Sequence, residues 1–276
     1  DSQALDEVVV VGYGTQKKVN LTGAVGSVDA ADLTKRVSPN ASSMLQGRVP
    51  GLQIVQNSAN PGAEQAAIQI RGQGTFSDAG SNPLVLIDGV EGDMNKVNPN
   101  MIENITVLKD AASASIYGSR AANGVILITT KNGTEGRLNI DYNFNMAWQS
   151  PTTKQDRITN SAEYMTLFNK ALTHTGGDIA TKGYKQEWID AYKNAAPGDP
   201  MYPNHDWYDD IIKTAPMQQH FLSVNGGKNG TTYNFGLGYL DQDGMVIKTG
   251  YKRYDAQMNL KTNLGGRVTF GTNINF

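Results

Sequence analysis

The acidic and aromatic cluster Asp206-Trp207-Tyr208-Asp209-Asp210 contains the residue types that could most directly act on a ligand. Glycosidases cleave a sugar linkage with a pair of carboxyl groups that flank the scissile bond. The cluster could also stack a sugar ring on Trp207 and bond the sugar hydroxyls, or Trp207 could be a packed aromatic residue that leads into a strand. Because adjacent acids on one segment do not flank a bond, we do not expect an enzyme.

Other catalytic or metal-binding machinery is missing from the sequence. The chain contains no Cys, which excludes disulfides, thiolate catalysis and Cys-ligated zinc. His174, His205 and His220 share no metal-ligand spacing, and no phosphate-binding loop, nucleophile elbow or dinucleotide fingerprint occurs. The stretch Asp241–Gly244 lacks the downstream ligands of a calcium loop and is expected to be a turn. We expect no catalytic residue, no metal site and no cofactor.

Composition and charge narrow the class of protein. The 24 Lys and Arg residues against 26 Asp and Glu residues leave a formal charge of -2, so nucleic acid is not an expected partner. The 30 glycines exceed the roughly 19 that average usage would give, which favours turns and strands. The richest apolar stretches, Val8–Val11, Leu84–Ile87 and Val125–Ile128, are far shorter than the roughly 18 residues of a membrane helix. If this protein spans a membrane, it does so with strands.

The segment from residue 21 to residue 134 is predicted to be a compact α+β domain. Short strand-like and helix-like pieces alternate there between Gly, Pro and Asn turns. Asp88-Gly89 is a predicted turn. The predicted strands are Leu52–Gln56, Ala67–Arg71, Leu84–Ile87, Ile105–Leu108 and Gly124–Thr130.

Two short helices are expected between these strands. One is Ser42–Arg48, and the other is Ala111–Tyr117. Asp110 is a suitable N-cap for the second helix, and Gly118 can end it in the left-handed conformation.

Residues 1–20 are predicted to form a flexible polar tail around the apolar run Val8–Val11. The run has high β propensity, but no nearby hairpin signal offers it a partner, so we expect an unpaired strand. Residues 1–6 lack the basic and apolar parts of a signal peptide. We therefore expect either a mature amino terminus or a start further into the protein.

From residue 135 to residue 276 the sequence predicts the first strands of a transmembrane β-barrel. Between Arg137 and Trp148, apolar and polar residues alternate almost without a break, and similar patterns occupy 233–239, 256–264 and 268–276. Tilted membrane strands need about 9 to 11 residues, apolar toward lipid and polar toward the lumen, whereas globular strands average about 5 to 6. Because a few strands cannot close a barrel, we expect a fragment of a larger wall.

The loops between these strands alternate in length, as one membrane topology requires. The segment from Gln149 to about Met217 is long, 226–230 is short, 241–253 is longer, and Gly265-Gly266 is shortest. The long segment is predicted to be an extracellular loop with two helices, Ser161–Thr173 and Lys185–Asn194. Their apolar stripes comprise Tyr164, Leu167, Phe168, Ala171 and Leu172 in the first helix, and Trp188, Ile189 and Tyr192 in the second.

Several stretches share the pattern of one family: Ile68–Gly72 (IQIRG), Pro83–Gly89 (PLVLIDG), Ile102–Asp110 (IENITVLKD) and Ile116–Thr130 (IYGSRAANGVILITT). They resemble the plug domain of TonB-dependent receptors. Asp6–Gln16 (DEVVVVGYGTQ) and Ser223–Gly227 (SVNGG) are similar to the SusC branch of that family.

The resemblance implies a transporter in the outer membrane of a Gram-negative bacterium. Members of that branch import oligosaccharides, and in some cases peptides, with a SusD-like surface lipoprotein as a lid and with energy supplied through TonB. The expected partners are therefore TonB, the lipoprotein, the cargo and outer-membrane lipid. A siderophore or vitamin receptor is the alternative within the family, and a soluble carbohydrate-binding β protein is the alternative of another class.

The resemblance also implies roles for single residues. By position, the TonB box comprises Glu7, Val8, Val9, Val10, Val11, Gly12 and Tyr13. An extended segment can add a strand to the edge of a TonB sheet after cargo binding releases it. The alternative is that Val8–Val11 pairs inside the plug.

Cargo contacts are expected from topology alone. They comprise Gln73, Phe76, Asp78 and Asn82 in one plug loop, the loop Asn57–Gly62, and Trp207. The plug motifs also supply residues with expected structural roles: Arg71, Gly72, Asp88, Gly89, Lys109, Asp110, Tyr117, Gly118, Arg120 and Gly124. The charged members, with Glu103, could form a relay, but ion pairs that tie the plug strands together or to the wall are the favoured interpretation.

Overall fold

The computed structural model describes residues 8–11, 14–17, 25–33, 38–63, 66–72, 82–153, 156–266 and 268–276. Two compact units emerge. One comprises residues 1–148, 216–244 and 249–276, and the other comprises 149–215 with 245–248. We call the second the loop unit. Within the described residues, no helix has both the length and the apolar character needed to cross a membrane.

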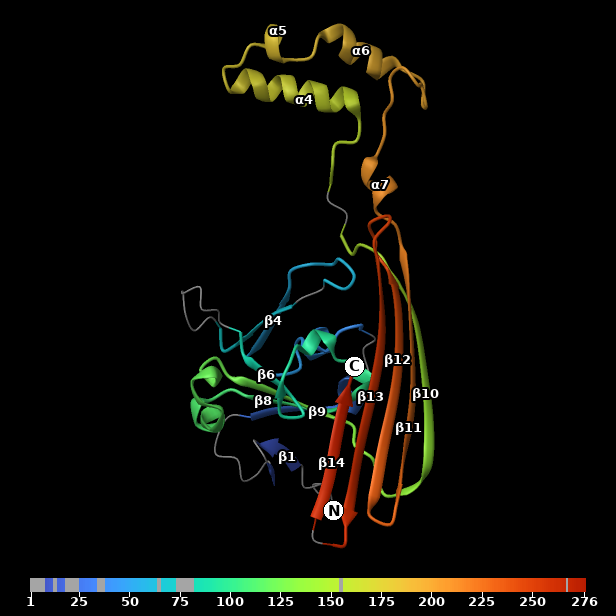
Figure 1. The fold of residues 1–276 in the computed structure, drawn as a ribbon. Helices are drawn as coiled ribbons and strands as arrows, with labels where there is room; N and C mark the ends of the chain where they lie inside the picture. Colours follow the sequence, from blue (N-terminus) through green and yellow to red (C-terminus); the bar gives the residue numbers. More distant parts are fainter. Residues whose placement is uncertain are drawn as a thin grey trace, which may run out of the picture. The chain divides into compact units, whose positions relative to one another are not determined.

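We call the predicted α+β domain, residues 21–134, the plug. A five-stranded mixed sheet forms its centre (Figure 1). Its order is β3-β8-β9-β6-β7, and β6 and β9 pair in parallel while the other neighbours are antiparallel. The strands are β3 (Val25–Asp29), β8 (Ile102–Leu108), β9 (Val125–Thr130), β6 (Leu84–Ile87) and β7 (Val90–Glu91). The strand Leu84–Ile87 and the turn Asp88-Gly89 are confirmed, and β9 differs from its prediction by one residue. β3 was not predicted, because its five residues include Gly26 and gain their pairing only from the distant β8.

The remaining plug elements are short. The strands β4 (Leu52–Gln56) and β5 (Ala66–Ile70) form a separate antiparallel pair, as predicted to within one residue. The helices are α1 (Ala30–Leu33), α2 (Ala41–Leu45) and α3 (Ala111–Ala114), with the 3-10 segments η2 (Met94–Lys96), η3 (Pro99–Met101) and η4 (Ser115–Ala121).

Both predicted plug helices are shorter in the structure. α2 ends at Leu45 rather than Arg48, and α3 gives way to η4 after Ala114. Gly118 lies inside η4 with φ of 68° and ψ of -154°, so it has the expected positive φ but interrupts the helical backbone. Only glycine adopts such dihedral angles readily.

The plug has an apolar core between its sheets and helices. Leu33, Leu45, Ile102, Ile105 and Val107 are fully buried within it. Burial of one such side chain contributes about 1.5–3 kcal/mol, so this cluster is the main stabilising feature of the plug.

The wall is a five-stranded sheet in sequence order, with β11 to β14 paired antiparallel (Figure 1). Its strands are β10 (Gly136–Gln149), β11 (Ala215–Lys228), β12 (Thr231–Asp243), β13 (Gly250–Leu264) and β14 (Val268–Asn275). All four predicted alternating segments are strands, and β10 spans 14 residues. This length exceeds the roughly 5 to 6 residues of an average globular strand.

The turns of the wall are tighter than predicted. The pairing of β11 with β12 continues to Lys228 and Thr231, so the turn consists of Asn229 and Gly230 rather than 226–230. Both turn residues have positive φ, 55° and 77°, which suits the right-handed twist of a two-residue hairpin. The longer connection covers 244–249 instead of 241–253, and Asp241 and Asp243 belong to β12. The turn at Gly265-Gly266 is therefore not the shortest.

The loop unit contains α4 (Ser161–His174), α5 (Ile179–Lys182), α6 (Gln186–Asn194) and α7 (Trp207–Ile211). Both predicted helices are confirmed, but the predicted stripe of α4 is not its buried face. Ala162 and Met165 are buried together with Ile189 of α6. Tyr164 and Phe168 instead pack against Tyr184 and stay partly exposed, because the small unit covers only one side of α4.

The strands β1 (Val8–Val11) and β2 (Gly14–Lys17) form a separate antiparallel pair, with Val8 opposite Lys17. The prediction that Val8–Val11 has no nearby partner is therefore wrong. The register leaves Gly12 and Tyr13 as the connection, which is the commonest hairpin spacing. Sequence inspection missed the hairpin because Gly-Tyr is not a strong two-residue turn signal.

Candidate functional site

The predicted TonB box is only partly described. Val8–Val11 form β1, whereas Glu7, Gly12 and Tyr13 lie outside the described residues. Each strand of a two-stranded sheet has two edges, and β2 occupies one edge of β1. An added strand could therefore pair along the other edge.

One residue from each of the two predicted cargo loops of the plug lines the same cavity. Gln73, Phe76 and Asp78 lie outside the described residues, but Asn82 and Asn57 line the same cavity of about 440 Å³. Asn95 lines it as well, and its amide oxygen accepts a hydrogen bond of 2.6 Å from Ser42. The structure thus brings together the two predicted loops through Asn57 and Asn82.

Asp88 and Asp110 fix strand ends of the plug. The Asp88 carboxylate accepts hydrogen bonds from the Thr130 amide at 2.9 Å and from the Thr130 hydroxyl at 2.6 Å. Asp110 does not cap α3 with its side chain and instead pairs with Arg71. Arg71 and Gly72 both have positive φ, at 59° and 88°, in the turn after β5.

Arg120 makes an exposed ion pair, and Lys109 makes a packing contact. Arg120 pairs with Glu91 at 2.8 Å on the surface. Lys109 covers Gly26, where an added Cβ would lie 3.3 Å from the Lys109 Cε. Tyr117 packs against the core beside β9.

Gly124 and Gly89 meet requirements that only glycine satisfies easily. A Cβ at Gly124 would lie 2.7 Å from Ile70 Cδ1 and 3.0 Å from the Leu108 carbonyl oxygen. Gly89 has φ of 86° in the turn after Asp88.

The inner face of the wall is polar where it meets the plug. Every buried residue of β13 is polar or charged, whereas β12 buries Gly236, Gly238 and Leu240 on the same side as its two buried amides. Gln219 of β11 joins them. The set comprises Gln219, Asn234, Gln242, Arg253, Asp255, Gln257 and Asn259.

One cluster of this face, which we call the latch, holds two plug loops. Arg253 Nη1 donates to the Pro39 carbonyl at 3.1 Å, and its Nε lies 3.0 Å from Asp255 Oδ1. Asp255 Oδ2 accepts from Asn98 Nδ2 at 2.8 Å. Gly238 lies beside them, where an added Cβ would be 2.4 Å from Asn98 Nδ2. Close approach of the plug loop therefore requires glycine at this position.

A second cluster, the anchor, holds the chain where the plug joins the wall. Asn259 Nδ2 donates to the Lys131 carbonyl at 2.6 Å and to the Thr130 hydroxyl at 3.0 Å. Asn234 Nδ2 donates to the same Lys131 carbonyl at 2.9 Å. The sequence analysis expected charged plug residues to form the ion pairs with the wall. The contacts in the structure instead involve wall residues that the sequence analysis did not name. The signal was visible as Arg253 and Asp255 in the polar register of β13.

Two titratable groups adjoin the anchor. Burial raises the pKa of Glu103 and lowers the pKa of Lys131. Their opposite charges partly offset both shifts, because each charge favours the ionised form of the other.

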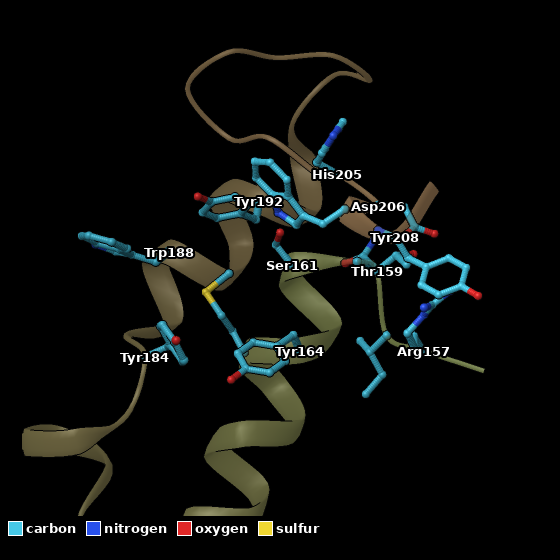
Figure 2. Close-up of a pocket in the computed structure, with 14 residues that line it drawn as sticks. Arg157, Thr159, Ser161, Tyr164, Tyr184, Trp188, Tyr192, His205, Asp206 and Tyr208 are labelled. Carbon is cyan, nitrogen blue, oxygen red and sulfur yellow. The ribbon is translucent and has the colours of Figure 1, made fainter. Parts of the chain in front are cut away.

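The loop unit contains an aromatic cavity of about 620 Å³ (Figure 2). Figure 2 shows Ser161 and Tyr164 on α4, Trp188 and Tyr192 on α6, and Arg157 beside Tyr208. Trp207 also lines the cavity and is 70% exposed, so the interpretation of a packed aromatic residue is wrong. Of the lining residues, the sequence analysis singled out Trp207 alone as a cargo contact, since side chains from α4 and α6 converge only in the fold.

The acids beside Trp207 are engaged within the unit. Asp206 caps α7 by accepting a hydrogen bond of 3.0 Å from the Tyr208 amide. Asp210 pairs with His205. The described part of the chain contains no group of three or more His, Asp or Glu side chains that could hold a metal ion.

Comparison with known proteins identifies the family. Residues 17–125 match the model of the TonB-dependent Receptor Plug Domain. The chain is 38% identical over 271 residues to the TonB-dependent receptor SusC of Bacteroides thetaiotaomicron, which covers 94% of this chain and 25% of SusC. The ferric enterobactin receptor PirA of Pseudomonas aeruginosa is 30% identical over 182 residues, covering 58% of this chain and 23% of PirA.

A solved structure agrees with these matches. The RagAB peptide importer in the open-open state superposes with a TM-score of 0.82 at 30% identity, over 98% of this chain and 32% of that chain. The chain spans about a quarter of the length of SusC, and that quarter holds the plug and five wall strands. The chain therefore belongs to the TonB-dependent receptors of the outer membrane, in the branch that includes SusC.

Proposed function

We propose that the whole protein imports oligosaccharides or peptides across the outer membrane, with TonB as its energy source and a SusD-like lipoprotein as its lid. The observation that carries this proposal is a plug held by polar contacts against a wall whose opposite face is apolar. A wall of this kind separates lipid from a polar lumen, and the plug occupies the lumen side. The greater similarity to SusC and RagAB than to PirA supports this branch over siderophore receptors.

In this proposal residues 1–20 are the tail that carries the TonB box, 21–134 are the plug, and 135–276 are the first wall strands with the outer loop 149–217. Asn82 and Trp207 are the proposed cargo contacts. Both are exposed and line cavities of a size that suits part of a chain-like cargo.

Purification of the full-length parent from native outer membranes tests the proposal. We expect mass spectrometry to find a lipoprotein of the SusD type and a bound glycan or peptide in the preparation. A receptor without a lipoprotein and with a bound siderophore or vitamin would contradict the proposal and support the alternative within the family.

The TonB-box assignment has its own test. Val9→Pro removes a backbone donor from β1, and we expect it to abolish TonB-dependent uptake while the receptor still reaches the outer membrane. Val9→Thr keeps both the donor and the β-branched side chain and should preserve uptake. Normal uptake by the Pro variant would refute the assignment.

A further inference from the structure

The aromatic cavity of the loop unit has the dimensions of a ligand site. Its volume of about 620 Å³ falls within the roughly 300–1,000 Å³ that small-molecule sites occupy. Six aromatic side chains line it: Tyr164, Tyr184, Trp188, Tyr192, Trp207 and Tyr208. Two of them are widely exposed, Trp188 at 61% and Trp207 at 70%. Exposed indole rings that share one hollow offer flat faces to a ligand.

The walls of the cavity are fixed by contacts inside the loop unit. The Ser161 amide donates to Asn204 Oδ1 at 2.7 Å, and the Ser161 hydroxyl donates to the Pro203 carbonyl at 3.2 Å. These bonds join the start of α4 to the segment that leads into α7. On the other side, the Tyr184 amide and carbonyl bond the Asn169 side chain at 2.8 and 2.7 Å. The site is preformed, which reduces the entropy lost on binding.

The charge of the cavity is close to neutral. Arg157 is the permanently cationic side chain among the described lining residues, and its guanidinium lies 3.4 Å above the Tyr208 ring. Asp206 contributes one carboxylate, which already caps α7. The buried Nε of Arg157 has no hydrogen-bond partner among the described residues. The cavity thus offers several phenolic hydroxyls, but no surplus of charge.

We propose that this cavity binds a neutral sugar ring of the cargo. The C–H groups on one face of a pyranose carry partial positive charge, and the face of an indole is negative, so the ring can lie flat on Trp207. The phenol groups would then meet its hydroxyls. This inference rests on the proposed function for its biological use, and it names the cargo class as saccharide.

Other ligand classes fit this cavity less well. Peptides are commonly bound along a sheet edge, in a helix groove or through terminal charges. None of the described lining residues belongs to a strand, and the helices and loops that line the cavity already bond one another through their polar groups. Anionic ligands such as ferric siderophores would call for several cations, whereas the described lining offers Arg157.

The test uses the full-length receptor, purified with any partner that accompanies it, on an array of neutral glycans and an array of peptides. We expect wild type to bind at least one neutral glycan, and Trp207→Ala to raise the Kd for it by about tenfold. Trp148→Ala is the matched control, because Trp148 is 65% exposed but lies on β10 outside the cavity. The control should bind within about twofold of wild type.

Misfolding does not account for a loss of binding in Trp207→Ala, since Trp207 is exposed and outside the buried cluster of the loop unit. Absence of glycan binding by wild type, equal losses in the two variants, or loss of peptide binding alone would each overturn the proposal. Measurement of uptake by cells distinguishes failure of the cavity proposal from failure of the proposed function. If the function fails, uptake is missing in wild type; if only the cavity fails, Trp207→Ala cells import cargo as wild type does.

Discussion

The centre of the plug sheet buries mainly apolar side chains, whereas the wall sheet buries amides and charged groups beside apolar residues such as Phe221 and Leu240. In the plug, Ile105 of β8 and Ile126 of β9 are fully buried. In the wall, Asn234 and Asp255 are buried while Leu237 and Tyr254 are 58% and 69% exposed. The central plug strands are almost continuously buried, because the residues of β9 alternate between two apolar clusters on the two faces of the sheet. The wall alternates between buried and exposed residues, and it faces the plug on one side and lipid on the other. A continuous apolar run therefore predicts a strand that is buried on both faces, whereas alternation predicts a strand without telling which face is buried.

The two arrangements should fail in different ways. An apolar core loses stability when a substitution leaves a cavity. A buried polar face loses stability when a substitution leaves a charge or an amide without its partner.

Removal of the acid from the latch should give the largest effect. Asp255→Ala leaves the buried guanidinium of Arg253 without its carboxylate, which costs about 3–5 kcal/mol. We expect hydrogen exchange in the loops at Pro39 and Asn98 to accelerate and passage of large antibiotics to increase. The double variant Arg253→Met with Asp255→Leu removes both charges and should recover part of the lost stability. Unchanged exchange in Asp255→Ala would show that the latch does not hold the plug.

Truncation of a side chain in the plug core should give the second-largest effect. Ile105→Ala removes three buried methyl or methylene groups from the fully buried cluster and should cost about 2–5 kcal/mol. Proteolysis of the plug in the purified full-length receptor measures the loss. Val90→Ala on β7 is the control, because Val90 is 71% exposed and should change proteolysis little. Equal susceptibility in the two variants would contradict an apolar plug core.

The outer face of the wall can be tested with a charge. Leu237 and Leu264 are equally exposed at 58%, but Leu237 lies in the middle of β12 and Leu264 at the end of β13. Arginine costs about 2–4 kcal/mol at the membrane midplane and about 0–1 near the interface. Leu237→Arg should therefore reduce the folded fraction in heat-modifiability gels more than Leu264→Arg. The opposite order would mean that this face does not contact lipid.

The exposed ion pair of the plug should give the smallest effect. Arg120 and Glu91 have side chains that are 69% and 61% exposed, so Arg120→Ala should cost at most about 1 kcal/mol. Urea unfolding of the plug, followed by hydrogen exchange, gives the value. A stability cost similar to that of Asp255→Ala would contradict the expectation that an exposed ion pair contributes less than a buried one.

Much of the fold followed from periodicity and turn residues. The long alternation from Arg137 to Trp148 gave β10, and Asp88-Gly89 gave the turn between β6 and β7. Local patterns could not give β3, whose partner is β8, or the hairpin of Val8–Val11, whose connection is not a standard turn signal. Those pairings depend on tertiary contacts and backbone geometry.

The site was less predictable than the fold. Gln73, Phe76 and Asp78 remain predictions, whereas Asn82 and Asn57 do meet at one cavity. The sequence analysis placed Arg253 at the end of the loop 241–253, and its bond to a backbone carbonyl of the plug depends on a loop position that no sequence period encodes.

The latch also indicates at which stage of wall assembly it can hold the plug. Its two bonds to the plug join residues that are separated by 157 and by 214 positions in the chain, whereas the hairpin of β11 and β12 closes over two residues. Contacts between distant residues carry a greater loop-closure entropy and form late. The wall can therefore grow strand by strand from local hairpins, but the latch forms only once β13 is in place. A closed latch thus requires a wall that is assembled at least as far as β13.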